Sequence, residues 1–234
     1  MYGVIPAAGR GSRLGSLTDN RPKPLVDVAG KPLLRHVFDA LEPHVDEFVV
    51  VIGYRGEQIR DRFGETSHDT PITYVEQAPR RGLAEALLRA QPAIDGPFVQ
   101  LNADNVLRGN IGDLLEHHRK TAADATLLVE RVSRERARRG GVIEYEDDDV
   151  VGLVEKPTEP PGRLSNTGCF AFSPRIFDGC RSISPSERGE YELADAITWL
   201  LDRGGRVECV TLDGWRVNVN TPADVRRAER RLLK

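Results

Sequence analysis

The sequence has few cysteines, few aromatic residues, no long apolar run and no surplus of basic charge. Its three cysteines, Cys169, Cys180 and Cys209, are odd in number and too scattered for a metal site, which favours reduced thiols in a cytoplasmic protein. No apolar run approaches the roughly 20 residues of a membrane span, and the N-terminus lacks a charged-then-apolar signal pattern. With 36 acidic and 33 basic residues, the net charge of -3 argues against a nucleic-acid partner.

What the first half does contain is an alternation of short apolar runs and amphipathic segments. All-apolar strands between helices predict an α/β fold with a mostly parallel sheet and helices on both faces. In such sheets ligands bind at the carboxyl ends of the strands. We expect strands at 2–6, 47–53, 72–77, 97–105 and 124–132, and helices at 33–41, 56–63, 82–91 and 111–120.

The second half is richer in strand patterns. Residues 140–157 predict a hairpin with the acidic run Glu146–Asp149 as its solvated turn. No repeat or linker interrupts the chain, which indicates one domain over 1–234, with a β-rich insertion packed on the α/β core. Further strands are expected at 164–174, 207–212 and 215–220, and helices at 191–201 and 222–233.

The loop after the first strand, AAGRGSRLG, combines glycines with arginines. It is not a dinucleotide-binding fingerprint, because Leu14 stands where a third glycine is needed, and no Gly-Lys-Ser/Thr closes it as in a P-loop. Glycines still let backbone N–H groups approach an anion, Arg13 can add a bidentate fork, and Lys23, between two prolines, adds a compact charge. Taken alone, the loop fits a phosphate site or a surface turn with solvated arginines.

The loop is part of a longer pattern, GxGxRLxxLTxxxPKPLVxVxGKPLL from Gly9 to Leu34, which resembles the opening signature of the sugar-1-phosphate nucleotidyltransferases. One departure is Ala103, which stands where that family usually has glycine. Further segments resemble the family in order along nearly the whole chain: QAPRRGLAEAL (77–87), LNADN (101–105), RGGVIE (139–144), VEKP (154–157), NTGCFAF (166–172), RGEYELADAI (188–197) and WRVNVNTPADV (215–225).

The resemblance implies a Rossmann-like core with a sugar-binding β insertion. Residues 1–132 would then mainly bind the nucleoside triphosphate (NTP), 133–220 would mainly serve the sugar phosphate, and 221–234 would form a closing helix. The implied reaction joins an NTP and a sugar 1-phosphate to give an NDP-sugar and pyrophosphate. Because the attacking phosphate oxygen is already an anion, this chemistry needs positioning and charge neutralisation rather than a general base.

On the nucleotide side, the resemblance implies that Arg13 pulls on the leaving pyrophosphate, Lys23 contacts the NTP phosphates and Asp104 holds Mg²⁺. Gln77 would read the base, since its amide offers a donor and an acceptor to a carbonyl and the N3–H of uracil or thymine. The catalytic residues would be Arg13, Lys23 and Asp104. The implied nucleotide-binding set is Ala8, Gly9, Gly11, Arg13, Lys23, Gln77 and Gly82.

On the sugar side, the resemblance implies that Lys156 binds the sugar phosphate and Glu155 accepts hydrogen bonds from sugar hydroxyls. The residues lining the pocket would be Gly141, Asn166 and Thr167. Asp104 and Asn218 would hold the metal. Many relatives have an aspartate where Asn218 stands; an amide oxygen also ligates Mg²⁺, but the lost negative charge predicts weaker metal binding.

We therefore expect a pyrimidine nucleotidyltransferase that uses UTP or dTTP and a sugar 1-phosphate, with glucose 1-phosphate as the first candidate. Two alternatives stay open: a related transferase with another NTP or a non-sugar phosphate such as phosphocholine, and a catalytically silent nucleotide sensor. Because the sequence stops after the helix at 222–233, we expect neither the regulatory site nor the acyl transfer of longer relatives. The choice between UTP and dTTP, the sugar and the oligomeric state are not readable from the sequence.

Overall fold

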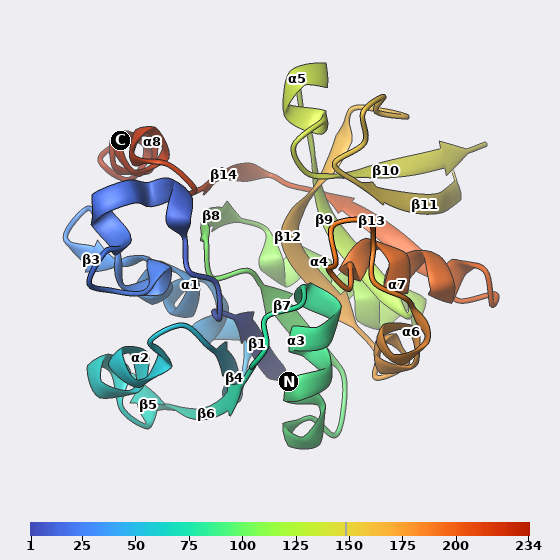
Figure 1. Cartoon of the computed structure of the whole chain (residues 1–234). Coiled ribbons are helices and arrows are strands. Elements are labelled where there is room, and N and C mark those ends of the chain that lie inside the picture. The colour runs from blue at the N-terminus through green and yellow to red at the C-terminus, as the bar shows by residue number, and fades with distance from the viewer. Residues whose placement is uncertain (148) are drawn as a thin grey trace.

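The computed structural model describes residues 1–147 and 149–234 and forms an α/β fold around a large mixed sheet (Figure 1). Its strands are hydrogen-bonded in the order β11-β10-β12-β7-β1-β4-β6-β5, while β9 also pairs with β12 and β13 with β9. Their bounds are β1 Tyr2–Pro6, β4 Glu47–Ile52, β5 Thr66–Ser67, β6 Thr70–Glu76, β7 Phe98–Leu101, β9 Ala125–Arg131, β10 Gly141–Glu146, β11 Asp149–Glu155, β12 Leu164–Phe172 and β13 Val207–Thr211.

The parallel core of the sheet consists of β7, β1, β4 and β6. Strands β7, β1 and β4 are almost entirely apolar because both of their faces are covered. The chain leaves β1 toward β4 on one side and later returns to β7 on the other, so the strand order reverses between β1 and β7. Ligands bind at such a switch point, outside the carboxyl ends of the strands. The α/β fold class predicted from the sequence is confirmed.

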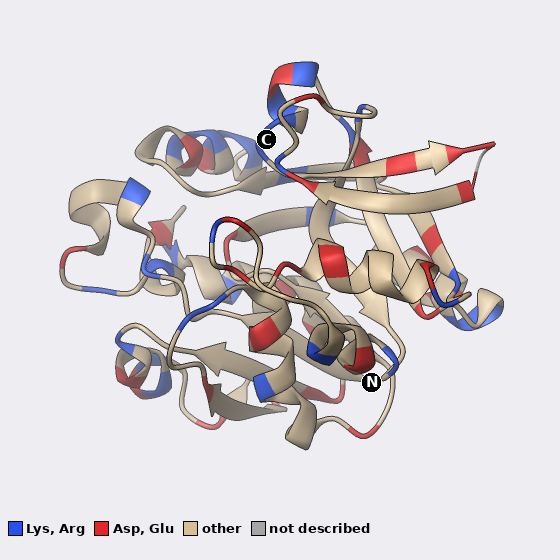
Figure 2. Cartoon of the chain, turned by 45° about the vertical axis from the view of Figure 1, so that its right-hand side comes forward, with Lys and Arg blue, Asp and Glu red and all other residues tan. Residues whose placement is uncertain are grey.

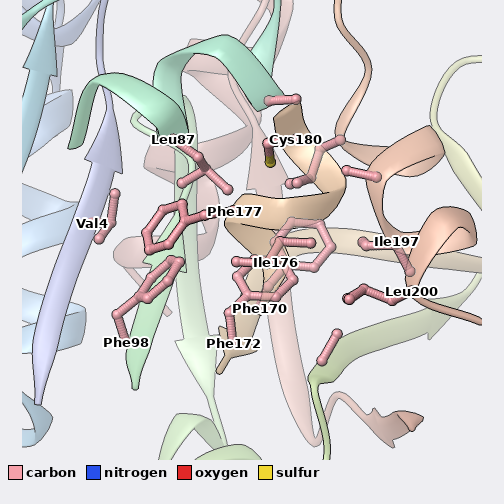
Figure 3. Close-up of a cluster of buried hydrophobic side chains, with 14 of the residues drawn as sticks. Val4, Leu87, Phe98, Phe170, Phe172, Ile176, Phe177, Cys180, Ile197 and Leu200 are labelled. Carbon is pink, nitrogen blue, oxygen red and sulfur yellow. The ribbon is translucent and has the colours of Figure 1, made fainter. Parts of the chain in front are cut away.

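Helices cover both faces of this sheet. Alternate side chains of one strand point to opposite faces, so Val4 belongs to the core under α3, α6 and α7, and Ile5 to the core under α1, α2 and α4. Figure 3 shows the first of these cores, where Phe98, Phe172 and Phe177 pack together. The helix bounds are α1 Leu33–Leu41, α2 Gly56–Phe63, α3 Leu83–Ala90, α4 Ile111–Thr121, α5 Arg134–Ala137, α6 Ile176–Ser182, α7 Leu193–Leu201 and α8 Pro222–Leu232, with 3-10 turns η1 Ser12–Thr18, η2 Lys23–Leu25, η3 Glu42–His44 and η4 Gln91–Ala93.

A smaller unit consists of two short two-stranded sheets that pack with the C-terminal helix α8. Strand β8 (Asn105–Gly109) pairs antiparallel with β14 (Gly214–Asn218), and β2 (Asp27–Val28) with β3 (Lys31–Pro32). A third apolar cluster joins this unit to the loop after β1, because Leu14 packs with residues of β8, β14 and α8. Strand β8, which follows β7 in the sequence, is thereby packed against the loop after β1.

Most predicted elements appear within a few residues of their expected bounds. The strand expected at 97–105 instead ends at Leu101, and the chain turns through Asn102–Asp104 into β8, which belongs to a different sheet. The hairpin over 140–157 is present as β10 and β11, and Figure 2 shows acidic residues toward its tip. Asp148, in the predicted acidic turn, lies outside the described residues. Within 1–147 and 149–234, none of the helices combines the length and apolarity that crossing a bilayer requires.

Candidate active site

The site lies where β1 and β7 end side by side at the switch point. The Ala103 backbone N–H donates to the carbonyl of Pro6 at 3.3 Å, which ties the turn after β7 to the start of the glycine loop. On its other side this turn contacts β12, because the Asn102 N–H donates to the Gly168 carbonyl at 3.0 Å. Gly168 has φ +79°, and a Cβ there would lie 2.7 Å from the Asn105 side chain. The turn therefore joins the nucleotide half of the predicted site to the sugar half.

A compact polar cluster forms around Lys23 in this cleft. The Lys23 ammonium is 2.9 Å from a carboxylate oxygen of Asp104 and donates to the side-chain oxygen of Asn220 at 2.9 Å. Arg13 donates to the same Asn220 oxygen at 2.8 Å. The structure thus brings together the three predicted catalytic residues, which are far apart in the sequence. Lys23 keeps one of its three N–H groups for a ligand.

The glycine loop packs closely against this lysine. Gly11 has φ +74°, and a Cβ at this position would lie 2.7 Å from the Cβ of Lys23, so only glycine fits there without strain. A Cβ at Gly9, in contrast, would meet nothing within 4 Å, so the loop faces open space at that point. The carbonyl of buried Ala8 accepts a hydrogen bond from the Tyr54 N–H. Gly9 thus borders open space, while Gly11 allows Lys23 to lie against the loop.

Asn220 was not predicted from the sequence, although it lies two positions after the predicted metal ligand Asn218. Its backbone is fixed by the capping box at the start of α8, where the Asn220 and Thr221 N–H groups both donate to Asp224. The second asparagine in NVNTP, directly before a capping motif, is the signal that could have identified Asn220 from the sequence. Both asparagines fall in the half predicted to serve mainly the sugar, yet they join the cluster around Lys23, where the Asn220 amide donates to the Asn218 side-chain oxygen.

The predicted metal ligands lie close together and have suitable atoms. Strand pairing aligns Asn218 with Asn105, and the Val219 N–H donates to the Asp104 carbonyl at 2.8 Å. One carboxylate oxygen of Asp104 contacts Lys23, while the other is buried and has no hydrogen-bond partner among the described residues. A buried acceptor without a donor suits a cation, and carboxylate and amide oxygens are ligands that Mg²⁺ prefers. The residues present therefore fit a magnesium ion.

A second group with metal-like spacing lies elsewhere, on α1, η3 and the loop after β5. It consists of Asp39, Glu42 and His68, whose ligand atoms lie within 4.8 Å of one another. Asp39 is already paired with Lys31 at 3.0 Å, and Glu42 accepts a hydrogen bond from Thr70. This group lies apart from the switch-point cleft, and two of its members already have partners of their own.

The predicted base-reading residues lie at the end of β6 and the start of α3. Gln77 is buried, and its side-chain nitrogen donates to the Gly82 carbonyl at 3.0 Å and to Glu85 at 2.7 Å. We expected this amide to offer a donor as well as an acceptor; in the structure both N–H groups are used internally, which leaves the oxygen. Gly82 has φ +105°, and a Cβ there would collide with the Tyr191 backbone.

The predicted sugar-side residues gather where β10, β11 and β12 meet. A Cβ on Gly141 would collide with the Asn166 amide and lie 3.1 Å from a Glu155 oxygen, so these three residues are direct neighbours. Lys156 is 3.2 Å from the Glu155 carboxylate and remains half exposed. It adopts φ +48°, an unusual conformation for a residue other than glycine and one that clusters at functional sites.

The environment of Glu155 affects its protonation. Burial raises the pKa of Glu155, and although Lys156 acts in the opposite direction, the net pKa is above its usual value. A cavity of about 690 Å³ lies beside this pair, between β11, α7 and the segment before α7. Thr167 is fully buried, with its hydroxyl donated to the Leu128 carbonyl at 2.8 Å, so its side chain positions β12 rather than offering a free group to a ligand.

Arg216 is a further residue that the sequence did not single out. It is largely buried on β14 and donates to Glu130 at 2.8 Å, to the Asn105 side chain at 3.2 Å and to the Asn166 carbonyl at 3.2 Å. Burial lowers the pKa of Arg216, partly offset by Glu130. One side chain thus connects the start of β8, next to Asp104, to the strand that carries Asn166.

The sequence is similar to known proteins over nearly its whole length. A family model described as "Nucleotidyl transferase" matches residues 2–231. The chain is 41% identical over 234 residues to the UTP–glucose-1-phosphate uridylyltransferase AglF of Haloferax volcanii, covering 99% of this chain and 96% of that protein. It is 32% identical over 233 residues to the bifunctional protein GlmU of Methanocaldococcus jannaschii, covering all of this chain but only 54% of that longer protein.

Solved structures also share this fold. A candidate glucose-1-phosphate thymidylyltransferase of Bacillus anthracis, in complex with sucrose, superposes with a TM-score of 0.89 at 26% identity, over 98% of this chain and 94% of that one. A UDP-glucose pyrophosphorylase complexed with UDP-glucose also reaches 0.89, at 22% identity, over 99% of this chain and 98% of that one. The second likeness bears on the fold alone.

Proposed function

The chain belongs to the nucleotidyl transferase family, and we propose that it transfers a nucleotidyl group from UTP or dTTP to a sugar 1-phosphate, glucose 1-phosphate in the first instance. The products are an NDP-sugar and pyrophosphate. The observation that carries the proposal is the cluster in which Arg13, Lys23 and Asp104 converge at the end of β1 and β7, next to the sugar-side strand β12. The similarity to AglF, named as a UTP–glucose-1-phosphate uridylyltransferase, supports the choice of substrates.

The reaction is an in-line displacement at the α-phosphorus of the NTP. A phosphate oxygen of the sugar 1-phosphate forms the new P–O bond while the bond from the α-phosphorus to the α–β bridging oxygen breaks, and pyrophosphate leaves with that electron pair. The protein must hold two repelling anions in line and neutralise the charge that moves to the leaving group. No proton has to be removed from the nucleophile.

The cluster around Lys23 is suited to the nucleotide phosphates. The remaining N–H of Lys23 can donate to phosphate oxygens, and so can the N–H groups of the Arg13 guanidinium that do not face Asn220. Backbone N–H groups near Gly9 border open space and can approach the triphosphate. Further positive charge surrounds the mouth of the loop, where the guanidinium groups of Arg10, Arg55 and Arg80 lie within 6 Å of the Tyr54 ring. Such a rim attracts a polyanion.

Asp104 and Asn218 would hold Mg²⁺. A bound Mg²⁺ would supply positive charge that offsets the negative charge of the nucleotide phosphates. The Asp104 carboxylate is paired with Lys23 at 2.9 Å, which places the lysine beside the residue that would hold the ion. We also propose a cytoplasmic location, where nucleoside triphosphates are available.

On the sugar side, Lys156 would contact the sugar phosphate and Glu155 the sugar hydroxyls. Their proximity to Gly141 and Asn166 supports a single pocket for these residues. Lys156 then screens the attacking anion from the triphosphate, and the two lysines serve different substrates. On the nucleotide side, the free oxygen of Gln77 would accept the N3–H of uracil or thymine.

Pyrophosphate release with all four ribonucleotides and dTTP, against a panel of sugar 1-phosphates and phosphocholine, tests this proposal. We expect Mg²⁺-dependent release with UTP or dTTP and glucose 1-phosphate. CTP and ATP should react about 5- to 150-fold more slowly, because their ring nitrogens leave the Gln77 oxygen facing a lone pair, at a cost of about 1–3 kcal/mol. Faster turnover with ATP or with phosphocholine would contradict the proposal, and binding without turnover would indicate a nucleotide sensor.

A further inference from the structure

We propose that Glu85 is a positioning residue that determines base specificity: it fixes the Gln77 side-chain amide so that its oxygen, and not its NH₂ group, meets the nucleotide base. The inference rests on the proposed function, in which Gln77 contacts the base. Neither the sequence motif nor the resemblance to a family singled out Glu85, which is a buried carboxylate in the first turn of α3.

The contacts define the orientation of the amide. The Gln77 nitrogen faces the Glu85 carboxylate at 2.7 Å and the Gly82 carbonyl at 3.0 Å. Both of these oxygens only accept hydrogen bonds, so the group that faces them must be NH₂. Rotating the amide by 180° would place its oxygen against two acceptors in a buried site, so both hydrogen bonds would be lost and replaced by repulsion between lone pairs. The Gln77 oxygen accepts no hydrogen bond from the described residues. It is also absent from their set of fully buried polar side-chain atoms without a partner, so it is accessible to a ligand.

This orientation requires Glu85 to stay ionised. Burial alone would raise the pKa of Glu85, but hydrogen bonds from Gln77, Arg89 and the Arg81 backbone outweigh burial and lower it. The guanidinium groups of Arg89 and Arg81 lie 3.0 Å and 3.7 Å from its other oxygen, Oε1. Because Gln77 faces Oε2 while the two guanidinium groups face Oε1, the carboxylate connects the basic side chains to the base-facing amide.

The consequence for the base follows from its hydrogen-bond pattern. Uracil and thymine present an N3–H to an acceptor, whereas cytosine presents a lone pair at N3. An amide held with its oxygen outward therefore accepts from the first two and repels the third. Specificity here includes rejection of the wrong base as well as attraction of the right one.

The test compares UTP with CTP in the variant Glu85→Gln. A glutamine side chain has nearly the same shape, but its NH₂ group can donate to the Gln77 oxygen, so the amide is no longer held in one orientation. We expect the UTP:CTP ratio of kcat/KM to fall about tenfold. The ratio of dissociation constants for the two Mg²⁺-nucleotides, measured by calorimetry without sugar phosphate, should fall similarly. Because the two nucleotides are compared as a ratio, a general loss of folded protein or of catalytic rate cancels.

Glu116→Gln is the matched control. Glu116 is also a helical carboxylate paired with a basic residue four positions on, Lys120 at 2.6 Å, but it lies on α4 and makes no contact with Gln77. Its UTP:CTP ratio should equal that of the unmodified protein. If Glu85→Gln slowed both nucleotides equally and left the ratio unchanged, Glu85 would serve only to stabilise α3, and the inference would be overturned.

A measurement on the unmodified protein removes any dependence on how Glu85→Gln folds. Both Gln77 side-chain N–H protons should exchange slowly with water by NMR, before and after UTP binds, because they are donated internally. Rapid exchange of these protons in the free protein would overturn the inference. If the unmodified protein used neither UTP nor dTTP, both the proposed function and this inference would fail. Turnover with UTP together with an unchanged ratio in Glu85→Gln would remove only the inference.

Discussion

Asp104→Asn is expected to lower kcat/KM for NDP-sugar formation by about 100- to 1,000-fold, the scale of losing one strong electrostatic contact to a transition state. The substitution keeps the shape of the side chain but removes the charge that faces Lys23 at 2.9 Å and the buried oxygen that suits a cation. Part of the loss should be recovered at high Mg²⁺, because weaker metal binding is offset by concentration. Initial rates measured over a Mg²⁺ titration give both effects.

Asp39→Asn is the control for this prediction. Asp39 is also a carboxylate paired with a lysine, Lys31 at 3.0 Å, and it belongs to the group with Glu42 and His68 that has metal-like spacing. We expect its rates and its Mg²⁺ dependence to match those of the unmodified protein. Near-normal activity of Asp104→Asn at low Mg²⁺ would show that Asp104 does not hold the metal. A shifted Mg²⁺ requirement in Asp39→Asn would show that the metal binds at the other carboxylate group.

Lys156→Ala is expected to weaken the use of sugar 1-phosphate by about 10- to 150-fold, because a charge-assisted contact to a phosphate contributes roughly 1.5–3 kcal/mol. Turnover should fall as well, since the same charge screens the attacking anion in the transition state. NTP binding, measured by calorimetry without sugar phosphate, should change little. Lys156 lies beside Glu155 on the sugar side, whereas Lys23 contacts Asp104.

Lys120→Ala provides the comparison, since Lys120 is an exposed lysine also paired with a glutamate, Glu116, outside the cleft. It should leave both substrate dependences unchanged. Loss of NTP binding in Lys156→Ala, with sugar phosphate dependence intact, would mean that the two lysines serve the opposite substrates from those proposed.

The sequence predicted those parts of the site that local patterns encode. The apolar periodicity located α1 and β1, and the motifs identified Lys23 and Asp104, which the structure brings into contact. The α/β fold class, with strands that end at the site, followed from the alternation of strands and helices. These features depend on short-range order along the chain, which single-sequence reasoning can read.

The remaining features depend on partners that are distant in the sequence. Strand β8 was missed because its partner, β14, lies more than 100 residues further along, and no local signal ends β7 at Leu101. Asn220 and Arg216 act through contacts with residues that only the fold makes neighbours. The orientation of the Gln77 amide was likewise unreadable, because it is determined by Glu85 and the Gly82 carbonyl rather than by Gln77 itself.

The central claim is that a phosphate oxygen of the sugar 1-phosphate attacks the α-phosphorus of a pyrimidine NTP. Glucose 1-phosphate labelled with ¹⁸O in its non-bridging phosphate oxygens, incubated with UTP, Mg²⁺ and the protein, tests it by ³¹P NMR. We predict that all of the label stays in UDP-glucose, with one labelled oxygen bridging the two phosphorus atoms, and that pyrophosphate carries none. Label in pyrophosphate would contradict the account, as would the absence of both UDP-glucose with UTP and dTDP-glucose with dTTP.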